Sequence, residues 1–199
     1  GIERRHVSPK DITASDLCLK AAEKLIQAEG WEKALMAVLA FCTQTPDYLN
    51  HPNSFVVHEK LGLKESTMCL DFYRGCPGWV VSLSSVSQLV GGGSIKRAIL
   101  LDGDTVSKVL NKNNREERPL FADAGTATAL EYDEYASPIY FNIGTKSEDG
   151  VAIASLDGGY RNPFTIESLS RRLKAIEGTL PMEEVTSKMD SMDVFSFAI

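Results

Sequence analysis

The sequence lacks any apolar run near the roughly 18 residues that a helix needs to cross a bilayer. Its first six residues carry charge and no apolar stretch, so a secretory signal is not expected there either. A cationic excess is also missing, because 21 Lys and Arg face 27 Asp and Glu and give a net charge of −6. Together these absences predict a cytoplasmic protein with no membrane span, and they exclude a general nucleic-acid binder.

Cysteine is scarce and unclustered, with four residues in 199 and no C-x-x-C pair. Cys18 falls on the apolar face of a predicted helix, while Cys42 and Cys69 fall inside apolar strands. We expect these three thiols to be small core residues, because free cysteine is among the most buried residue types. This usage argues against a disulfide scaffold and favours a reducing compartment.

Histidine is scarcer still, and no His or Cys has metal-ligand spacing, so no metal site is expected. His6 lies in the charged opening segment, His51 precedes a proline in a loop, and His58 lies on a polar helix face. We expect all three to be solvated or capping residues and assign none of them as a catalytic base.

What the sequence does contain is an alternation of strands and helices, which predicts βαβ units and an α/β sheet with right-handed connections. The length suits one domain or one half of a two-part fold. Ser15 is the expected cap of the first helix. The predicted helices are 15–29, 53–61, 79–90 and 165–176, and the predicted strands are 35–42, 67–73, 96–104, 126–132 and 138–144.

The fourth cysteine, Cys76, lies where strand 67–73 turns into segment 79–90, between Gly75 and Gly78. That segment has no charged residue, so we expect a helix buried on every side. A thiol at a helix N-terminus is stabilised as thiolate by the free N–H groups and the positive end of the macrodipole. Cys76 is therefore a candidate nucleophile, with a structural cysteine as the alternative from spacing alone.

Residues 177–188 are acidic and loop-like, and the chain stops within an apolar run at 193–199. A domain rarely ends on an uncapped apolar run, so we expect the natural polypeptide to continue.

Five stretches in order carry a family resemblance over about 130 residues. They are Gly1-Ile2-Glu3-Arg4-Arg5, Thr43 to Tyr48, His58 to Leu63, the elbow from Asp71 to Leu83, and Gly103-Asp104 with Leu120 to Ala127. Together they resemble the β-ketoacyl-ACP synthase III family of the thiolase-like superfamily. The resemblance implies the N-terminal half of a layered α/β thiolase-like fold with a mixed sheet and a buried central helix behind the cysteine. It places that half at 1–162, and a helical connection with the start of the C-terminal half at 163–199.

The resemblance implies a condensing acyltransferase of lipid metabolism and fatty acid biosynthesis. Cys76 would accept the acyl group of an acyl-CoA primer, and its own N–H would hold the oxyanion. Decarboxylative Claisen condensation with malonyl-ACP would follow, without a metal or prosthetic cofactor. Arg115 matches the position of an arginine that contacts CoA, although a solvated loop charge is the alternative. The family's catalytic His and Asn come from the second half and have no match here, so we expect residues 1–199 alone to be inactive in condensation. Relatives pair through a sheet edge, which implies a homodimer and acyl carrier protein as partners.

Three positions depart from the family pattern: Arg74 and Pro77, where small residues are usual, and Ala122, where glycine is usual. They leave two alternatives open, namely the same fold with another acyl-transfer outcome, and a non-catalytic thiolase-fold subunit.

Overall fold

The chain is described by a computed structural model that covers residues 2–110, 115, 118–146 and 157–177. It divides into two compact units, Gly1–Ser107 with Ala122–Ile143, and Lys108–Phe121 with Gly144–Ile199. The elements of the first unit are α1 (Ala14–Glu29), β1 (Val38–Thr43), α2 (Asn53–Leu61), β2 (Met68–Tyr73), α3 (Gly78–Gly91), β3 (Arg97–Asp104) and β4 (Ala124–Glu131), with short 3₁₀ turns at Lys33–Leu35 and Val106–Lys108. The second unit contains α4 (Ile166–Glu177).

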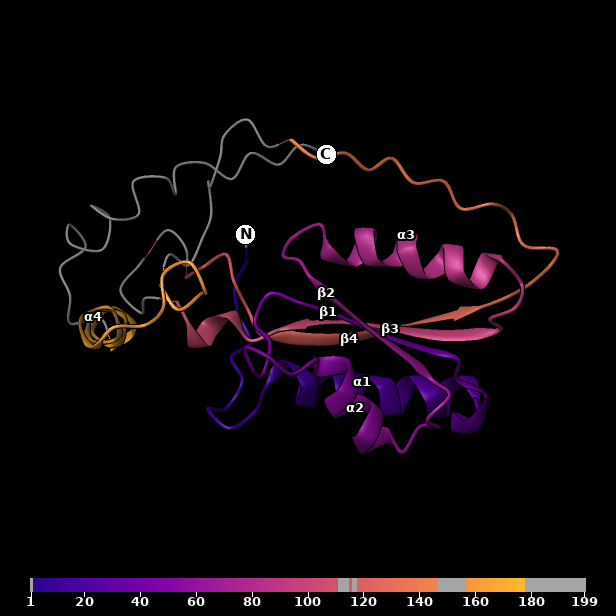
Figure 1. Cartoon of the computed structure of the whole chain (residues 1–199), viewed down its shortest axis with the longest axis horizontal. Coiled ribbons are helices and arrows are strands. Elements are labelled where there is room, and N and C mark those ends of the chain that lie inside the picture. Colours follow the sequence, from indigo (N-terminus) through magenta and orange to yellow (C-terminus); the bar gives the residue numbers. More distant parts are fainter. Residues whose placement is uncertain (1, 111–114, 116–117, 147–156, 178–199) are drawn as a thin grey trace. The chain divides into compact units, whose positions relative to one another are not determined.

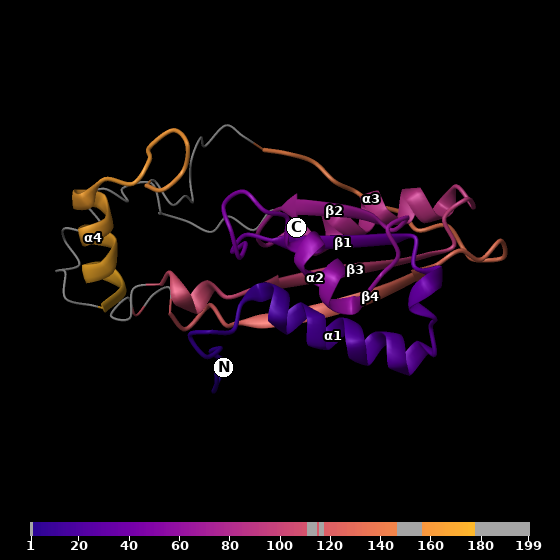
Figure 2. The same cartoon turned by 60° about the horizontal axis from the view of Figure 1, so that its bottom comes forward.

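The four strands form one mixed sheet in the order β2-β1-β3-β4. β1 runs parallel to both β2 and β3, whereas β4 is antiparallel to β3 (Figures 1 and 2). Every residue of β1 is buried, as expected for a central parallel strand covered on both faces, and this explains its apolar sequence up to Thr43. The predicted α/β class is confirmed, and so are the predicted strands up to 132, within a few residues at their ends.

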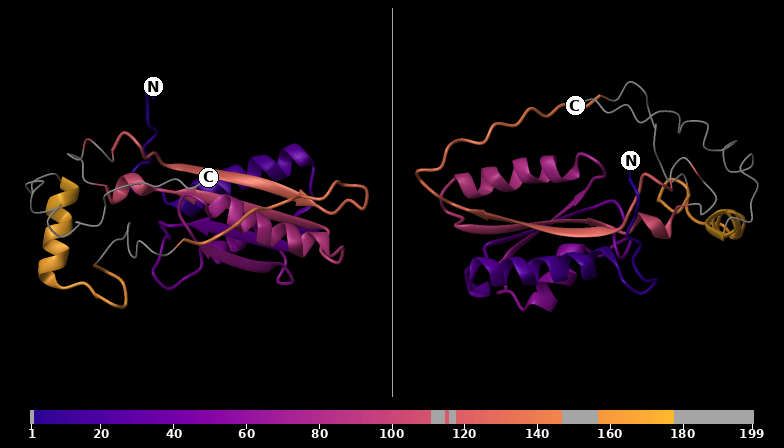
Figure 3. Two further views of the ribbon diagram at one scale, coloured as in Figure 1. Left: turned by 90° about the horizontal axis from the view of Figure 1, so that it is seen from above. Right: turned by 180° about the vertical axis from the view of Figure 1, so that it is seen from behind.

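Helices cover both faces of the sheet, with α1 and α2 on one side and α3 on the other (Figures 1 and 3). Each face therefore has its own apolar core. On the side of α1 and α2 it includes Cys18, Ala22, Leu39, Phe41, Val57, Leu61, Ile99 and Leu101, and on the side of α3 it includes Val38, Ala40, Val86, Val90, Ala98 and Leu100.

The first helix begins one residue earlier than Ser15, and the expected cap was wrong. Thr13 is the N-cap, and both its N–H (3.0 Å) and its hydroxyl (2.9 Å) donate to the Asp16 carboxylate. Ser15 lies inside the first turn, fully buried, and its hydroxyl donates to Asp47 at 2.6 Å. Ser15 thus connects the helix to the loop after β1 and does not cap its own backbone.

Helix α3 is confirmed, but it is buried on one side only. Its buried residues are Gly78, Ser82, Val86 and Val90, a stripe at four-residue spacing, while Trp79 is 42% exposed. The reason is geometric: one sheet covers one side of a helix, and no second layer covers the other side among the described residues.

The strand predicted at 138–144 was wrong, because these residues are described and pair with no other strand. Their side chains are largely exposed, as in Tyr140 at 89%. An extended apolar sequence becomes a strand only when another backbone pairs with it. The helix predicted at 165–176 is confirmed as α4. The structure describes residue 177 but not the rest of the acidic segment 177–188. The apolar run 193–199 also lies outside the described residues.

Candidate functional site

The candidate site lies where the carboxyl ends of three parallel strands meet at one edge of the sheet. β1 ends at Thr43, β2 at Tyr73 and β3 at Asp104, and the register places the last residues of β1 beside those of its two neighbours. Ligands of open α/β sheets bind outside this edge. Cys76 follows β2 by three residues, so the fold carries it to this edge.

Cys76 is exposed and lies in a tight turn two residues before α3 begins. The Gly78 N–H closes this turn by donating to the Gly75 carbonyl at 2.7 Å. In the part of the chain that the structure describes, no hydrogen bond is made by the N–H or the thiol of Cys76. Both groups are therefore free to meet a substrate carbonyl, which is the arrangement that a nucleophile with a backbone oxyanion donor requires.

Two side chains near the end of β1 lie directly against the elbow and leave no room for a side chain at Gly75 or Gly78. A methyl group at Gly75 would be 2.6 Å from Oε1 of Gln44, and one at Gly78 would be 2.5 Å from Sγ of Cys42. The Cys42 thiol also donates to the Arg74 carbonyl at 3.8 Å. The elbow is thus seated on the end of β1.

The loop after β1 is anchored by one carboxylate. Oδ1 of Asp104 accepts hydrogen bonds from the Thr43 hydroxyl (2.7 Å), the Gln44 N–H (2.8 Å) and the N–H and hydroxyl of Thr45 (3.1 and 3.0 Å). The Thr45 hydroxyl in turn accepts from the Thr105 N–H at 2.9 Å. The backbone under the elbow is therefore fixed by charge-assisted bonds.

Asp102 lies beneath the start of α3, with Oδ2 at 3.7 Å from the methyl position of Gly78. Burial raises the pKa of Asp102, a hydrogen bond from the Cys42 thiol opposes this, and the Asp104 charge adds to it. Burial, with the negative charges of Asp102 and Asp104, raises the pKa of Cys42 to about 11. Cys42 is therefore a thiol at neutral pH.

The remaining cysteines confirm the expected core role. Cys18 is fully buried in α1, and burial raises its pKa to about 12. Cys69 is partly buried in β2, and burial raises its pKa too. All four cysteines are free, and Cys76 alone among them is exposed.

Each of the three histidines makes a contact among the described residues. The His6 carbonyl accepts from the Asp123 N–H at 2.8 Å, and Nε2 of His58 lies 2.9 Å from the Lys64 carbonyl. The His51 ring packs edge-on against Tyr48 at a centroid distance of 6.0 Å. Over the described residues, no group of three or more His, Cys, Asp or Glu side chains could hold a metal ion, and no helix is long and apolar enough to cross a membrane.

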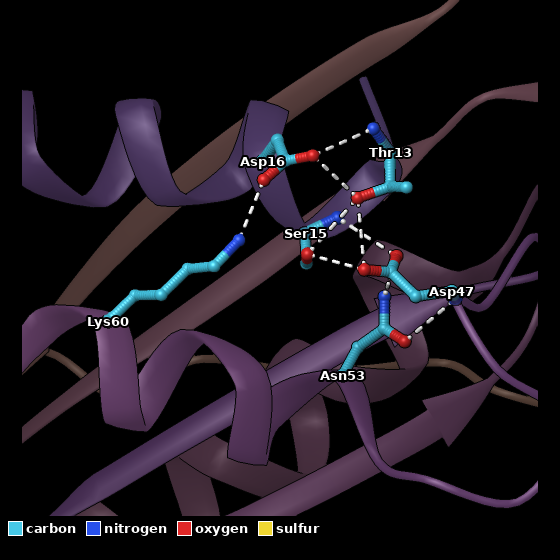
Figure 4. A network of polar contacts seen from close by, with 6 residues as sticks. All are labelled: Thr13, Ser15, Asp16, Asp47, Asn53 and Lys60. Carbon is cyan, nitrogen blue, oxygen red and sulfur yellow. Dashed lines mark hydrogen bonds and ion pairs between the residues drawn. The ribbon is translucent and has the colours of Figure 1, made fainter. Parts of the chain in front are cut away.

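A second polar network, centred on Asp47, fixes the later part of the loop between β1 and α2 (Figure 4). Asp47 accepts from the hydroxyls of Thr13 (2.9 Å) and Ser15 and from the Asn53 amide (3.0 Å). Burial would raise the pKa of Asp16, but its bonds to Lys60 and Thr13 outweigh this and lower it to about 2. The network ties the loop to the starts of α1 and α2.

An open groove of about 270 Å³ lies between the loop that follows β1 and the end of β2. Tyr48, His51, Asp71 and Tyr73 are among its lining residues, and Cys76 is not. The Asp71 carboxylate accepts from the N–H groups of Asn53 (2.8 Å) and Ser54, and therefore caps α2.

The other sequence-predicted residue, Arg115, is exposed at a turn in the second unit. The structure thus gives no support from contacts for its proposed CoA role, which stays a prediction. The sequence did not predict that Gln44, Cys42, Asp102 and Asp104 belong to the site. Their signal was present, since polar residues at the carboxyl ends of predicted parallel strands must meet at one edge.

Comparisons with known proteins bear on the family and the fold. A family model described as 3-Oxoacyl-[acyl-carrier-protein (ACP)] synthase III matches residues 70–147, which include Cys76. The beta-ketoacyl-[acyl-carrier-protein] synthase III of Desulfitobacterium hafniense (strain Y51) is 26% identical over 200 residues, which cover 100% of this chain and 57% of that protein. The chain therefore spans little more than half the length of the curated relatives that it matches.

Two solved structures are similar in fold. A 3-oxoacyl-(acyl-carrier-protein) synthase III structure has a TM-score of 0.75 and 30% identity, covering 81% of this chain and 49% of the other. The 3-oxoacyl-(acyl-carrier protein) synthase from Burkholderia xenovorans LB400 has a TM-score of 0.65 and 38% identity, covering 67% of this chain and 38% of the other. The thiolase-like fold class, represented by its N-terminal half, is thereby confirmed.

Proposed function

Because this chain is related in sequence and in fold to the β-ketoacyl-ACP synthase III family, we propose that it is the nucleophile-bearing half of a condensing acyltransferase. The observation that carries the proposal is the position of Cys76, an exposed thiol at the turn between β2 and α3, inside the segment that the family model matches. Residues 1–162 form this half, and residues 163–199 begin the next.

In the first step the Cys76 thiolate attacks the thioester carbonyl of an acyl-CoA. The carbonyl oxygen becomes an oxyanion, which the Cys76 N–H stabilises, and the C–S bond to CoA then breaks to expel the CoA thiolate, which takes up the proton that the Cys76 thiol lost. Arg115 contributes positive charge for the CoA phosphates. The acyl group is left on Cys76 as a thioester.

In the second step malonyl-ACP loses CO₂, and the resulting carbanion attacks the acyl carbon on Cys76. A C–C bond forms, the C–S bond to Cys76 breaks, and β-ketoacyl-ACP leaves with the thiolate regenerated. The residues that stabilise this carbanion in the family, a His and an Asn, have no counterpart among the residues assigned here. The reaction needs no metal or prosthetic cofactor.

The partners follow from the same proposal. The acyl carrier protein delivers the malonyl group, and a second copy of the chain pairs along β2, an edge strand that pairs only with β1 among the described strands. A fatty acid pathway in the cytoplasm suits four free cysteines, because thiols persist in a reducing compartment.

The test is the intact mass of the full-length protein that contains this chain, after incubation with a panel of acyl-CoAs. We expect one acyl adduct, lost in Cys76→Ala and kept in the matched control Cys69→Ala, whose thiol is partly buried in β2. The best-loaded chain length would name the primer. Absence of an adduct with every acyl-CoA and acyl-ACP would contradict the proposal and favour the non-catalytic subunit.

Analysis of the products distinguishes condensation from another acyl-transfer reaction. An adduct that malonyl-ACP converts to β-ketoacyl-ACP supports condensation. An adduct that is passed to another acceptor without loss of CO₂ supports a different acyl transfer, for which the unusual neighbours Arg74 and Pro77 leave room.

A further inference from the structure

The side chain of Gln44 occupies the space where a side chain at Gly75, the residue before the nucleophile, would lie. Measured from the methyl position of Gly75, its Oε1 lies at 2.6 Å, its Cδ at 3.3 Å and its Nε2 at 3.7 Å. The amide therefore packs against the Gly75 Cα, and a side chain at 75 would have to displace it.

The backbone of Gln44 cannot drift away from this position. Its N–H donates to Oδ1 of Asp104 at 2.8 Å, and the two flanking threonine hydroxyls bind the same oxygen at 2.7 and 3.0 Å. Because the backbone of Gln44 is fixed to the sheet edge, its side chain is held in a defined position against Gly75.

Besides Gln44, the Cys42 thiol holds the elbow by donating to the Arg74 carbonyl at 3.8 Å. The turn is closed by one hydrogen bond, from the Gly78 N–H to the Gly75 carbonyl, while Cys76 is exposed and makes none within the described residues. The Gln44 amide likewise makes no side-chain hydrogen bond within that part of the chain. It acts on Gly75 by contact and shape.

We propose that Gln44 is a positioning residue for the reaction of Cys76: its side chain sets the orientation of the Gly75–Cys76 peptide and so the direction of thiolate attack. This inference rests on the proposed function, because it concerns the acyl acceptor. Acyl transfer needs the sulfur, the thioester carbon and the oxyanion donor in register, and small misplacements of a reacting group are costly. Alkylation of an exposed thiol by iodoacetamide has no such requirement.

The experiment compares the two reactions of Cys76 in the full-length protein. We expect Gln44→Ala to slow acylation by acyl-CoA about tenfold and to change the iodoacetamide rate by less than about twofold. Gln44→Met, which keeps the length and loses the amide, should restore most of the acylation rate. Gln88→Ala, an exposed glutamine near the end of α3, is the matched control and should alter neither rate.

A second variant tests the contact itself. Gly75→Ala should slow acylation in the wild-type background, because its methyl group displaces the Gln44 amide, and should have little further effect in Gln44→Ala. Additive losses, or equal losses of acylation and alkylation, would overturn the proposal. A normally acylated Gln44→Ala would contradict the positioning role alone, whereas a wild-type protein that takes no acyl group would remove the proposed function and this role with it.

Discussion

At the scale of single residues, the strongest constraints are carboxylates that collect hydrogen bonds from distant segments. Asp123 is 6% exposed and accepts from the N–H and hydroxyl of Ser8 (2.7 and 2.8 Å) and of Ser107 (2.9 and 2.6 Å). Burial would raise the pKa of Asp123, but these bonds outweigh it and lower the pKa. One side chain thus joins the N-terminal segment, the turn after β3 and the start of β4.

We predict that Asp123→Asn lowers the free energy of unfolding by about 1–3 kcal/mol at pH 7, because the amide turns an N–H₂ toward serine donors. The folded pKa is below the unfolded one, so the carboxylate's contribution is complete above the ordinary Asp value of about 3.9 and is lost as pH falls through the folded pKa. Urea unfolding from pH 7 to pH 2 checks this.

The difference between wild type and Asp123→Asn should therefore shrink in acid. Asp11→Asn, at an exposed position, is the control and should be neutral throughout. A difference that stays constant down to pH 2 would contradict the ionised role of Asp123.

At the scale of elements, glycines decide how closely α1 approaches the sheet. A methyl group at Gly125 in β4 would lie 2.6 Å from the backbone N of Cys18 and from the backbone C of Leu17. A methyl group at Gly103 in β3 would lie 2.5 Å from Sγ of Cys18. The small side chains of α1 and these glycines together let helix and strands meet at backbone contact.

We predict that Gly125→Ala lowers the free energy of unfolding by about 3 kcal/mol or more, because backbone atoms of α1 cannot move aside as a flexible side chain can. Gly91→Ala, at the last residue of α3 with nothing within 4 Å, should be neutral or slightly stabilising. Denaturant unfolding of the two variants under the same conditions checks both. Equal effects would show that α1 yields at this contact.

At the scale of the whole molecule, β2 leaves one sheet edge unpaired among the described residues, and its exposed residues include Met68 and Tyr73. An open edge invites another strand, and the one charged residue of β2, Asp71, is engaged in hydrogen bonds that cap α2. We predict that a double variant, Met68→Lys with Tyr73→Lys, weakens self-association of the full-length protein by about tenfold or more. Sedimentation velocity checks this, with Gln27→Lys on the exposed side of α1 as control. A dimer that is equally strong in the double variant would place the interface elsewhere.

The proposal also limits what residues 1–199 can do. We predict that this chain alone forms no β-ketoacyl product from acyl-CoA and malonyl-ACP. The His and Asn that stabilise the carbanion in the family come from the second half of its members and have no match in residues 1–199. Product analysis by mass spectrometry, beside the full-length protein, checks this. Turnover by the chain alone would show that it carries its own condensation machinery.

Much of the fold was predictable from the sequence, because the spacing of apolar residues and the positions of glycines are local properties of the chain. The apolar run that forms most of β1 and the glycines that end α1 and α2 predicted those elements within a few residues. The elbow was also predictable, because a strand, a glycine-flanked cysteine and an uncharged helix follow one another directly. The prediction of a strand at 138–144 was wrong because a strand needs a partner strand, which the local sequence does not specify.

Only the tertiary structure decided what surrounds the elbow. Gln44 and Asp102 are 32 and 26 residues from Cys76 in sequence, by subtraction of residue numbers, and parallel pairing of β1 and β3 brings both beneath it. The same holds for Ser15, which lies inside the first turn of α1 behind the Thr13 cap and whose hydroxyl donates to Asp47 on the distant loop after β1. Local patterns fix which elements form, whereas contacts between distant residues depend on register and packing, which exist only in the folded chain.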